Sequence, residues 1–291
     1  MSVHYLKSGI DSTRARPGLI VLLYFANLAM GLILSIPILI AFSSVLSSSG
    51  FSPELAEEFD LSLWADLLRE SGPVLQTVFA QMLWLIPVIY VWKIVLSVGL
   101  IEAHVNGGGG SFWKGVGRDT GRATILGMVY LVIFVAAVIG VIIVASILST
   151  VLSGEKGTLW VWFIFTPLAI FMAMALIDMM HDFGRLELVV SGKGIMESWF
   201  AGMKWPFISG SANSIYLGWM VLGLVALFIP LLLDLRMGGL FLAFLVQQLF
   251  LFLRAGVTVG WIASEVHFFE DMRVAMEPTI ATDAATEEGT V

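Results

Sequence analysis

The stretch ATILGMVYLVIFVAAVIGVIIVASILST, residues 123–150, contains no charged side chain. About 20 apolar residues suffice for a helix to cross the hydrocarbon core of a bilayer. The stretch does not alternate apolar and polar residues, which favours a helix over a strand of a membrane barrel. A second run without charge covers residues 18–42. Hydrophobic residues make up 58% of the 291 residues and charged residues 13%, far from a soluble composition. We therefore expect an all-α, polytopic membrane bundle.

Six spans are predicted, near residues 18–44, 74–101, 123–150, 158–180, 213–233 and 239–263. They form a transmembrane domain, residues 18–272, between a cytoplasmic or interfacial segment, residues 1–17, and an acidic tail, residues 273–291. The tail has too little apolar content to fold, so we expect it to be disordered. The first span is too long for the apolar core of a cleaved signal peptide and should remain as an anchor.

The loop charges predict the orientation of the bundle. Most Lys and Arg of the loops lie on the side that carries both termini, which places both termini in the cytoplasm. The first outer loop, residues 47–73, is rich in acids and has Arg69 as its basic residue. We expect one or two short amphipathic helices on the outer surface there. A cation site or a docking surface is the alternative, although the acids lack the spacing of a calcium loop.

Charged residues also fall within the predicted spans, at Lys93, Asp178 and Arg254. A charge at the bilayer centre costs roughly 2.5–3.5 kcal/mol on insertion scales, so such residues usually face protein or water and find partners. Two cations and one anion at comparable depth predict an intramembrane charged cluster. We favour a structural ion pair or snorkelling over a cavity for an anion, a lipid headgroup or a proton path.

Acids and histidines gather at the cytoplasmic ends of the second, fourth and sixth spans. They predict a boundary polar site of Glu102, His104, His181, Asp182, Glu187, Glu265 and His267. Such side chains are metal ligands, but residues two apart on a helix point in different directions, so neither Glu-x-His pair chelates by itself. Asp178 and His181 are three apart and can share a face. We favour polar caps at the membrane boundary, in which the acids pair with nearby Lys and Arg. We predict no metal and no cofactor.

The chain also shows a threefold internal similarity, in which a polar lead-in, a span, an outer turn and a second span recur. A glycine of each lead-in precedes a tyrosine of the next span by 14 or 15 residues: Gly9 and Tyr24, Gly115 and Tyr130, Gly202 and Tyr216. The units share one orientation, unlike the inverted repeats of many transporters. Chance similarity of apolar segments is the alternative.

Three short motifs carry a resemblance to a known group. They are Phe112-Trp113-x-Gly115, Asp178 with Phe183-Gly184-Arg185, and Gln247-Gln248-Leu249-Phe250 with Arg254. Through them the chain resembles uncharacterised bacterial six-span integral membrane proteins, loosely similar to the membrane domain associated with glycerophosphodiester phosphodiesterases. The resemblance implies a protein of the bacterial cytoplasmic (inner) membrane. The chain contains no phosphodiesterase catalytic domain, so that activity does not carry over.

No catalytic motif accompanies these features: the sequence has no Gly-x-Ser-x-Gly elbow, no His-Glu-x-x-His and no cysteine. We therefore predict a non-enzymatic scaffold or accessory subunit of a membrane complex. Its expected partners are the lipid bilayer and other membrane proteins, and no nucleic acid. The alternative is a small transporter or channel for an anionic or lipid-like solute, and an intramembrane metal enzyme ranks third.

Overall fold

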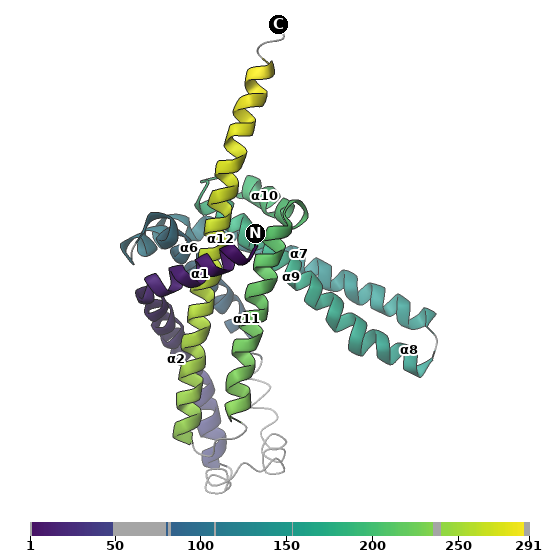
Figure 1. Ribbon diagram of the computed structural model, residues 1–291. Coiled ribbons are helices and arrows are strands. Elements are labelled where there is room, and N and C mark those ends of the chain that lie inside the picture. Colours follow the sequence, from purple (N-terminus) through teal and green to yellow (C-terminus); the bar gives the residue numbers. More distant parts are fainter. Residues whose placement is uncertain are drawn as a thin grey trace. The chain divides into compact units, whose positions relative to one another are not determined.

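The computed structural model describes residues 2–48, 80, 83–107, 109–152, 154–234 and 240–287, and all secondary structure in them is helical (Figure 1). The all-α class is therefore confirmed. In chain order the elements are α1 (Ser2–Ala15), α2 (Pro17–Ser48), α6 (Leu85–Asn106), α7 (Gly109–Val151), α8 (Glu155–Trp160), the π-helix η1 (Val161–Phe165), α9 (Thr166–Val189), α10 (Ile195–Ile208), α11 (Gly210–Asp234) and α12 (Leu240–Glu287).

Six helical segments of the described residues are long and apolar enough to cross a membrane, which is the number predicted. They are Pro17–Pro37, Leu85–Asn106, Gly109–Val151, Lys156–Val189, Gly210–Phe228 and Phe244–Ala275. Large apolar side chains on their surfaces are exposed, such as Val132 of α7 at 69% and Met172 of α9 at 61%. An apolar surface of this extent is typical of a membrane protein, because lipid covers it. The chain is a bundle of transmembrane helices.

Several helices extend past the predicted spans. Of the glycine run 107–110, which the sequence suggests is a flexible linker, Gly107 forms a turn with a φ of 73°, and α7 already begins at Gly109. Only glycine adopts such a backbone conformation without cost. The last helix, α12, ends at Glu287, past residue 273, where the tail is predicted to begin, and the disorder of that tail stays a prediction. The predicted helices of the outer loop fall on residues 49–79, outside the described residues.

The chain divides into two compact units. One consists of residues 1–21 and 94–291, and the other consists of residues 22–93. The second unit contains most of α2 and the beginning of α6. The first unit contains α1 and everything from the C-terminal half of α6 onwards, and the functional groups described below belong to it.

Within the first unit, α7 packs against α9 and α11 packs against α12, each pair running side by side (Figure 1). Three lead-in helices cross other long helices: α1 crosses α12, α10 crosses α9, and the first turns of α7, residues 109–122, cross α6. Each lead-in helix uses a glycine to approach two residues that lie one turn apart on a long helix. Gly115 lies against Val98 and Glu102 of α6, Gly202 against Met180 and Gly184 of α9, and Gly9 against Gly260 and Ser264 of α12.

These crossings form a closed order: two lead-in helices pack on the long helix that precedes them in the chain, and the first lead-in helix packs on the last long helix. The lead-in of α7 follows α6 directly in the chain and α10 follows α9, whereas α1 packs against α12 from the opposite end of the sequence. A Cβ atom at Gly9, Gly115 or Gly202 would overlap the facing helix, so glycine is needed at all three. The same glycine-mediated crossing used three times supports a true internal repeat over chance similarity.

The contact of α1 with α12 is centred on Ser264, whose side chain is fully buried. Its Oγ atom donates to the Tyr5 carbonyl oxygen at 2.9 Å and accepts from Trp219 Nε1 at 2.9 Å. The Tyr5 ring also packs edge-on against Phe268, with ring centroids 5.3 Å apart. Burial and the neighbouring Asp271 carboxylate raise the pKa of Tyr5. One small hydroxyl thereby joins α1, α11 and α12.

Candidate functional site

The residues predicted to form the boundary polar site are mostly buried. Six of them are less than 8% exposed, and only His267 is half-buried: the buried ones are Glu102, His104, His181, Asp182, Glu187 and Glu265. Buried polar groups in a protein need hydrogen-bond partners, because leaving one unpaired costs about 1–3 kcal/mol. All but His104 and His267 fall into two groups within the first unit, an ion-pair ladder and an Asp178 cluster.

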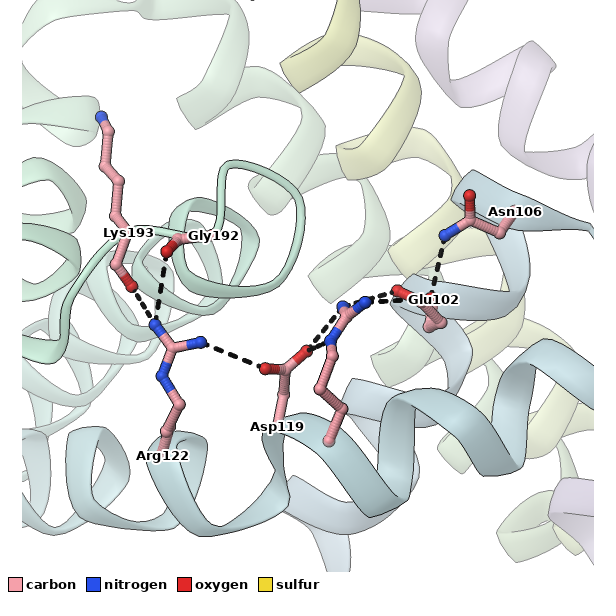
Figure 2. Close-up of polar contacts among 7 residues, drawn as sticks. Glu102, Asn106, Asp119, Arg122, Gly192 and Lys193 are labelled. Carbon is pink, nitrogen blue, oxygen red and sulfur yellow. Dashed lines mark hydrogen bonds and ion pairs between the residues drawn. The ribbon is translucent and has the colours of Figure 1, made fainter.

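The ion-pair ladder consists of Glu102, Arg118, Asp119, Arg122 and the carbonyl groups of Gly192 and Lys193 (Figure 2). Arg118 Nη2 lies 2.9 Å from Glu102 Oε2 and 2.7 Å from Asp119 Oδ2. Arg122 Nη1 lies 3.3 Å from Asp119 Oδ1, and Arg122 also donates to the carbonyls of Gly192 and Lys193. The ladder thus runs from α6 across α7 to the turn that joins α9 and α10.

A second pair continues the ladder to α10. Lys193 Nζ lies 2.8 Å from Glu187 Oε2, and Trp205 Nε1 of α10 donates to Glu187 Oε1 at 3.3 Å. The acids are buried, with Glu102 at 2% and Asp119 at 1% side-chain exposure, whereas Arg118 is 47% exposed. Each buried carboxylate of the ladder is therefore paired with a cation whose side chain is partly exposed. This arrangement limits the cost of burying the acids.

The Asp178 cluster consists of Asp178, His181, Asp182 and Arg185 of α9, Tyr216 of α11, and Trp261 and Glu265 of α12. The spacing of Asp178, His181 and Asp182 brings them to one face of α9. One ligand atom from each lies within 4.8 Å of the others, so these three residues could hold a metal ion. His181 and Asp182 are buried, and Asp178 is exposed.

Neighbouring helices surround this face with donors. The Tyr216 hydroxyl donates to Asp178 Oδ2 at 2.9 Å, and Arg185 pairs with Asp182 and donates to Ser97 of α6. Trp261 packs edge-on against Tyr216, with centroids 5.0 Å apart, and donates to Glu265 Oε1 at 2.6 Å. Glu265 lies within electrostatic range of both Asp178 and Arg185. The cluster therefore joins α9 to α11, α12 and α6.

The structure distributes the predicted intramembrane cluster differently. Asp178 and Arg254 form no ion pair in the part of the chain that the structure describes, and Asp178 is bonded to Tyr216 instead. Arg254 is exposed on α12. Lys93 belongs to the other compact unit, so its placement relative to Asp178 is not described. The other two histidines of the predicted boundary site, His104 of α6 and His267 of α12, lie within electrostatic range of each other.

Three members of the two groups, Arg185, Asp119 and Tyr216, are absent from the site predicted from the sequence. Arg185 lies past residue 180, where the fourth span is predicted to end, whereas α9 continues to Val189. The pattern Arg118-Asp119-x-x-Arg122, with opposite charges one turn apart on a helix, is a signal that could have identified Asp119. The signal for Tyr216 was its position in the internal repeat.

Comparison of the chain with protein-family models, with curated proteins and with solved structures finds no match. No catalytic family is identified.

Proposed function

We propose that this chain is a non-enzymatic membrane subunit, a scaffold or accessory component of a membrane complex. The observation that carries the proposal is that the buried carboxylates of the described residues are all engaged by the chain's own donors. These acids and their donors are Glu102 with Arg118, Asp119 with Arg118 and Arg122, Asp182 with Arg185, Glu187 with Lys193 and Trp205, and Glu265 with Trp261. A general acid or base has to reach a substrate proton, and these carboxylates are instead held in ion pairs and hydrogen bonds. The bonds of Glu102 to Arg118 and of Glu187 to Trp205 also join neighbouring helices.

The lipid-facing surface supports the same proposal. The long helices α7 and α9 expose apolar side chains over most of their length, including Val132, Ile143 and Met172. Helices associate in a bilayer through close packing rather than through a hydrophobic driving force, so such a surface can accept lipid or another membrane helix. We place the protein in the bacterial cytoplasmic membrane with both termini in the cytoplasm, on the basis of the loop charges and the resemblance described above.

Site-specific photo-crosslinking in native membranes tests the scaffold function. A photoreactive residue at Val132 or Met172 should give a discrete protein adduct, because both side chains are more than half exposed. The matched control is the same residue at Leu126 of α7, which is fully buried and should give no intermolecular adduct. Adducts with lipid alone at both exposed positions would contradict the proposal.

A transporter or channel for an anionic or lipid-like solute is the second candidate. Arg254 favours it, because this cation is exposed within the candidate span of α12 and forms no ion pair among the described residues. The test is flux of an anion or of a labelled phospholipid in proteoliposomes. Flux that exceeds protein-free vesicles and falls with Arg254→Leu would support this candidate, and flux equal to protein-free vesicles would eliminate it.

A further inference from the structure

We propose that Asp178, His181 and Asp182 of α9 bind one divalent metal ion of the zinc class. The site goes beyond the scaffold function and does not depend on it. It starts from the placement of three ligand atoms within 4.8 Å of one another on one helix face. Two of the three residues are more than nine-tenths buried, with His181 at 6% and Asp182 at 7% exposure.

The geometry is close to that of a bound ion. Zinc bonds to imidazole nitrogen and carboxylate oxygen are about 2.0–2.2 Å long, which places tetrahedral ligands about 3.4 Å apart. The three atoms therefore have to close by roughly 1.5 Å at most. Asp178 is exposed, so its side chain has room to adjust toward the ion.

The two carboxylates are already oriented by outer partners. Tyr216 donates to the Oδ2 atom of Asp178, and Arg185 binds the Oδ1 atom of Asp182. Each of these bonds occupies one oxygen, and a carboxylate has two. Metal-binding carboxylates in proteins are typically held in this way by hydrogen bonds from a second layer of residues. The cluster thus has the ligands and the groups that orient them.

The charge of the cluster favours a cation. Asp178 and Asp182 contribute two carboxylates, against the one guanidinium of Arg185. This part of α9 belongs to a candidate span, where an excess of negative charge is costly. A divalent ion would neutralise that excess. An imidazole among the ligands favours zinc and related transition metals over magnesium and calcium, which prefer oxygen ligands.

Zinc binding to the purified full chain tests the site. The protein should carry an affinity tag without histidine, be stripped with a chelator, and be titrated with zinc in detergent while bound zinc is counted by elemental analysis. We expect about one zinc per chain. His181→Gln and Asp178→Asn should each weaken binding at least tenfold, since loss of even an outer partner typically costs 10–100-fold.

His104→Gln is the matched control. His104 is also buried, at 7% exposure, on a long helix of the first unit, where its Nδ1 atom contacts the Leu100 carbonyl oxygen. This variant should bind zinc like the wild type. The proposal is overturned if the wild type binds no zinc, if His104→Gln loses as much binding as His181→Gln, or if Asp178→Asn keeps the wild-type affinity. Because Asp178 is exposed, its variant gives a result even if His181→Gln does not fold.

Discussion

Asp119 receives two guanidinium groups on a side chain that is only 1% exposed. Burying a carboxylate is costly unless its charge is paired, and here Arg118 and Arg122 of the same helix pair with it. Arg118 also binds Glu102, so this one side chain of α7 forms an ion pair with α6. The sequence could predict that Glu102 is a polar group at a helix end. It could not predict this partner, because the pairing depends on how α6 packs against α7.

Replacing Asp119 with Asn should destabilise the protein by about 1–3 kcal/mol. The amide cannot neutralise the two guanidinium groups, but their 47% and 39% exposure lets solvent take over part of that role, so the loss falls short of that for a fully buried pair. The measurement is the melting temperature in detergent. Asp11→Asn, at an exposed position of α1, is the control and should melt like the wild type. Equal melting of the two variants would show that the ladder adds nothing to stability.

At the scale of the element, α7 is one helix with two environments. Its first turns, residues 109–122, cross α6, and its later turns form an apolar span. The sequence predicts the span correctly because the charge-free run is long. It does not predict that the polar lead-in belongs to the same helix, since continuing a helix needs only backbone hydrogen bonds and leaves no mark in hydrophobicity. The same reason explains why α9 continues past residue 180 to carry Asp182 and Arg185.

Glycine-to-alanine substitutions within α7 should separate packing from helix propensity. A Cβ at Gly115 would overlap Glu102, so Gly115→Ala should destabilise the protein by about 1–3 kcal/mol. A Cβ at Gly117 or Gly121 meets nothing within 4 Å, so alanine there should be neutral or stabilising by up to about 1 kcal/mol. Thermal melting of the three variants gives the comparison. If Gly115→Ala melts like Gly117→Ala, the close crossing with α6 is wrong.

At the scale of the whole molecule, the described residues contain six helical segments long and apolar enough to span a membrane, which is the predicted number. This number follows from hydrophobicity and length alone, which is why it could be predicted. The closed order of lead-in helices could not, since the contact of α1 with α12 joins residues at the two ends of the sequence and involves Ser264 and Gly9, small residues whose packing has no periodic pattern. The repeated spacing between glycine and tyrosine is the signal of this arrangement that the sequence contains.

An even number of spans predicts the sidedness of the connecting turns. Fusions of a cytoplasm-active reporter at Lys193 and after the C-terminus should be active, and a fusion at Gly154, between α7 and α8, should be inactive. Reporter activity in cell lysates, normalised to expression, provides the control for folding of the reporter. A C-terminus on the opposite side of the membrane from Lys193 would require an odd number of spans between Lys193 and the C-terminus. That result would refute the topology.

The bond from Ser264 to the Tyr5 carbonyl joins residues that are 259 positions apart. A ribosome that adds about 5–20 residues per second therefore completes Tyr5 roughly 15–50 s before its partner exists. During that interval α1 has been synthesised but has no α12 to pack against, while α7 and α10 can each dock onto the helix made just before them. Docking of α1 onto α12 therefore has to wait until Ser264 has been synthesised, and a chain terminated before that residue lacks the partner of the Tyr5 carbonyl.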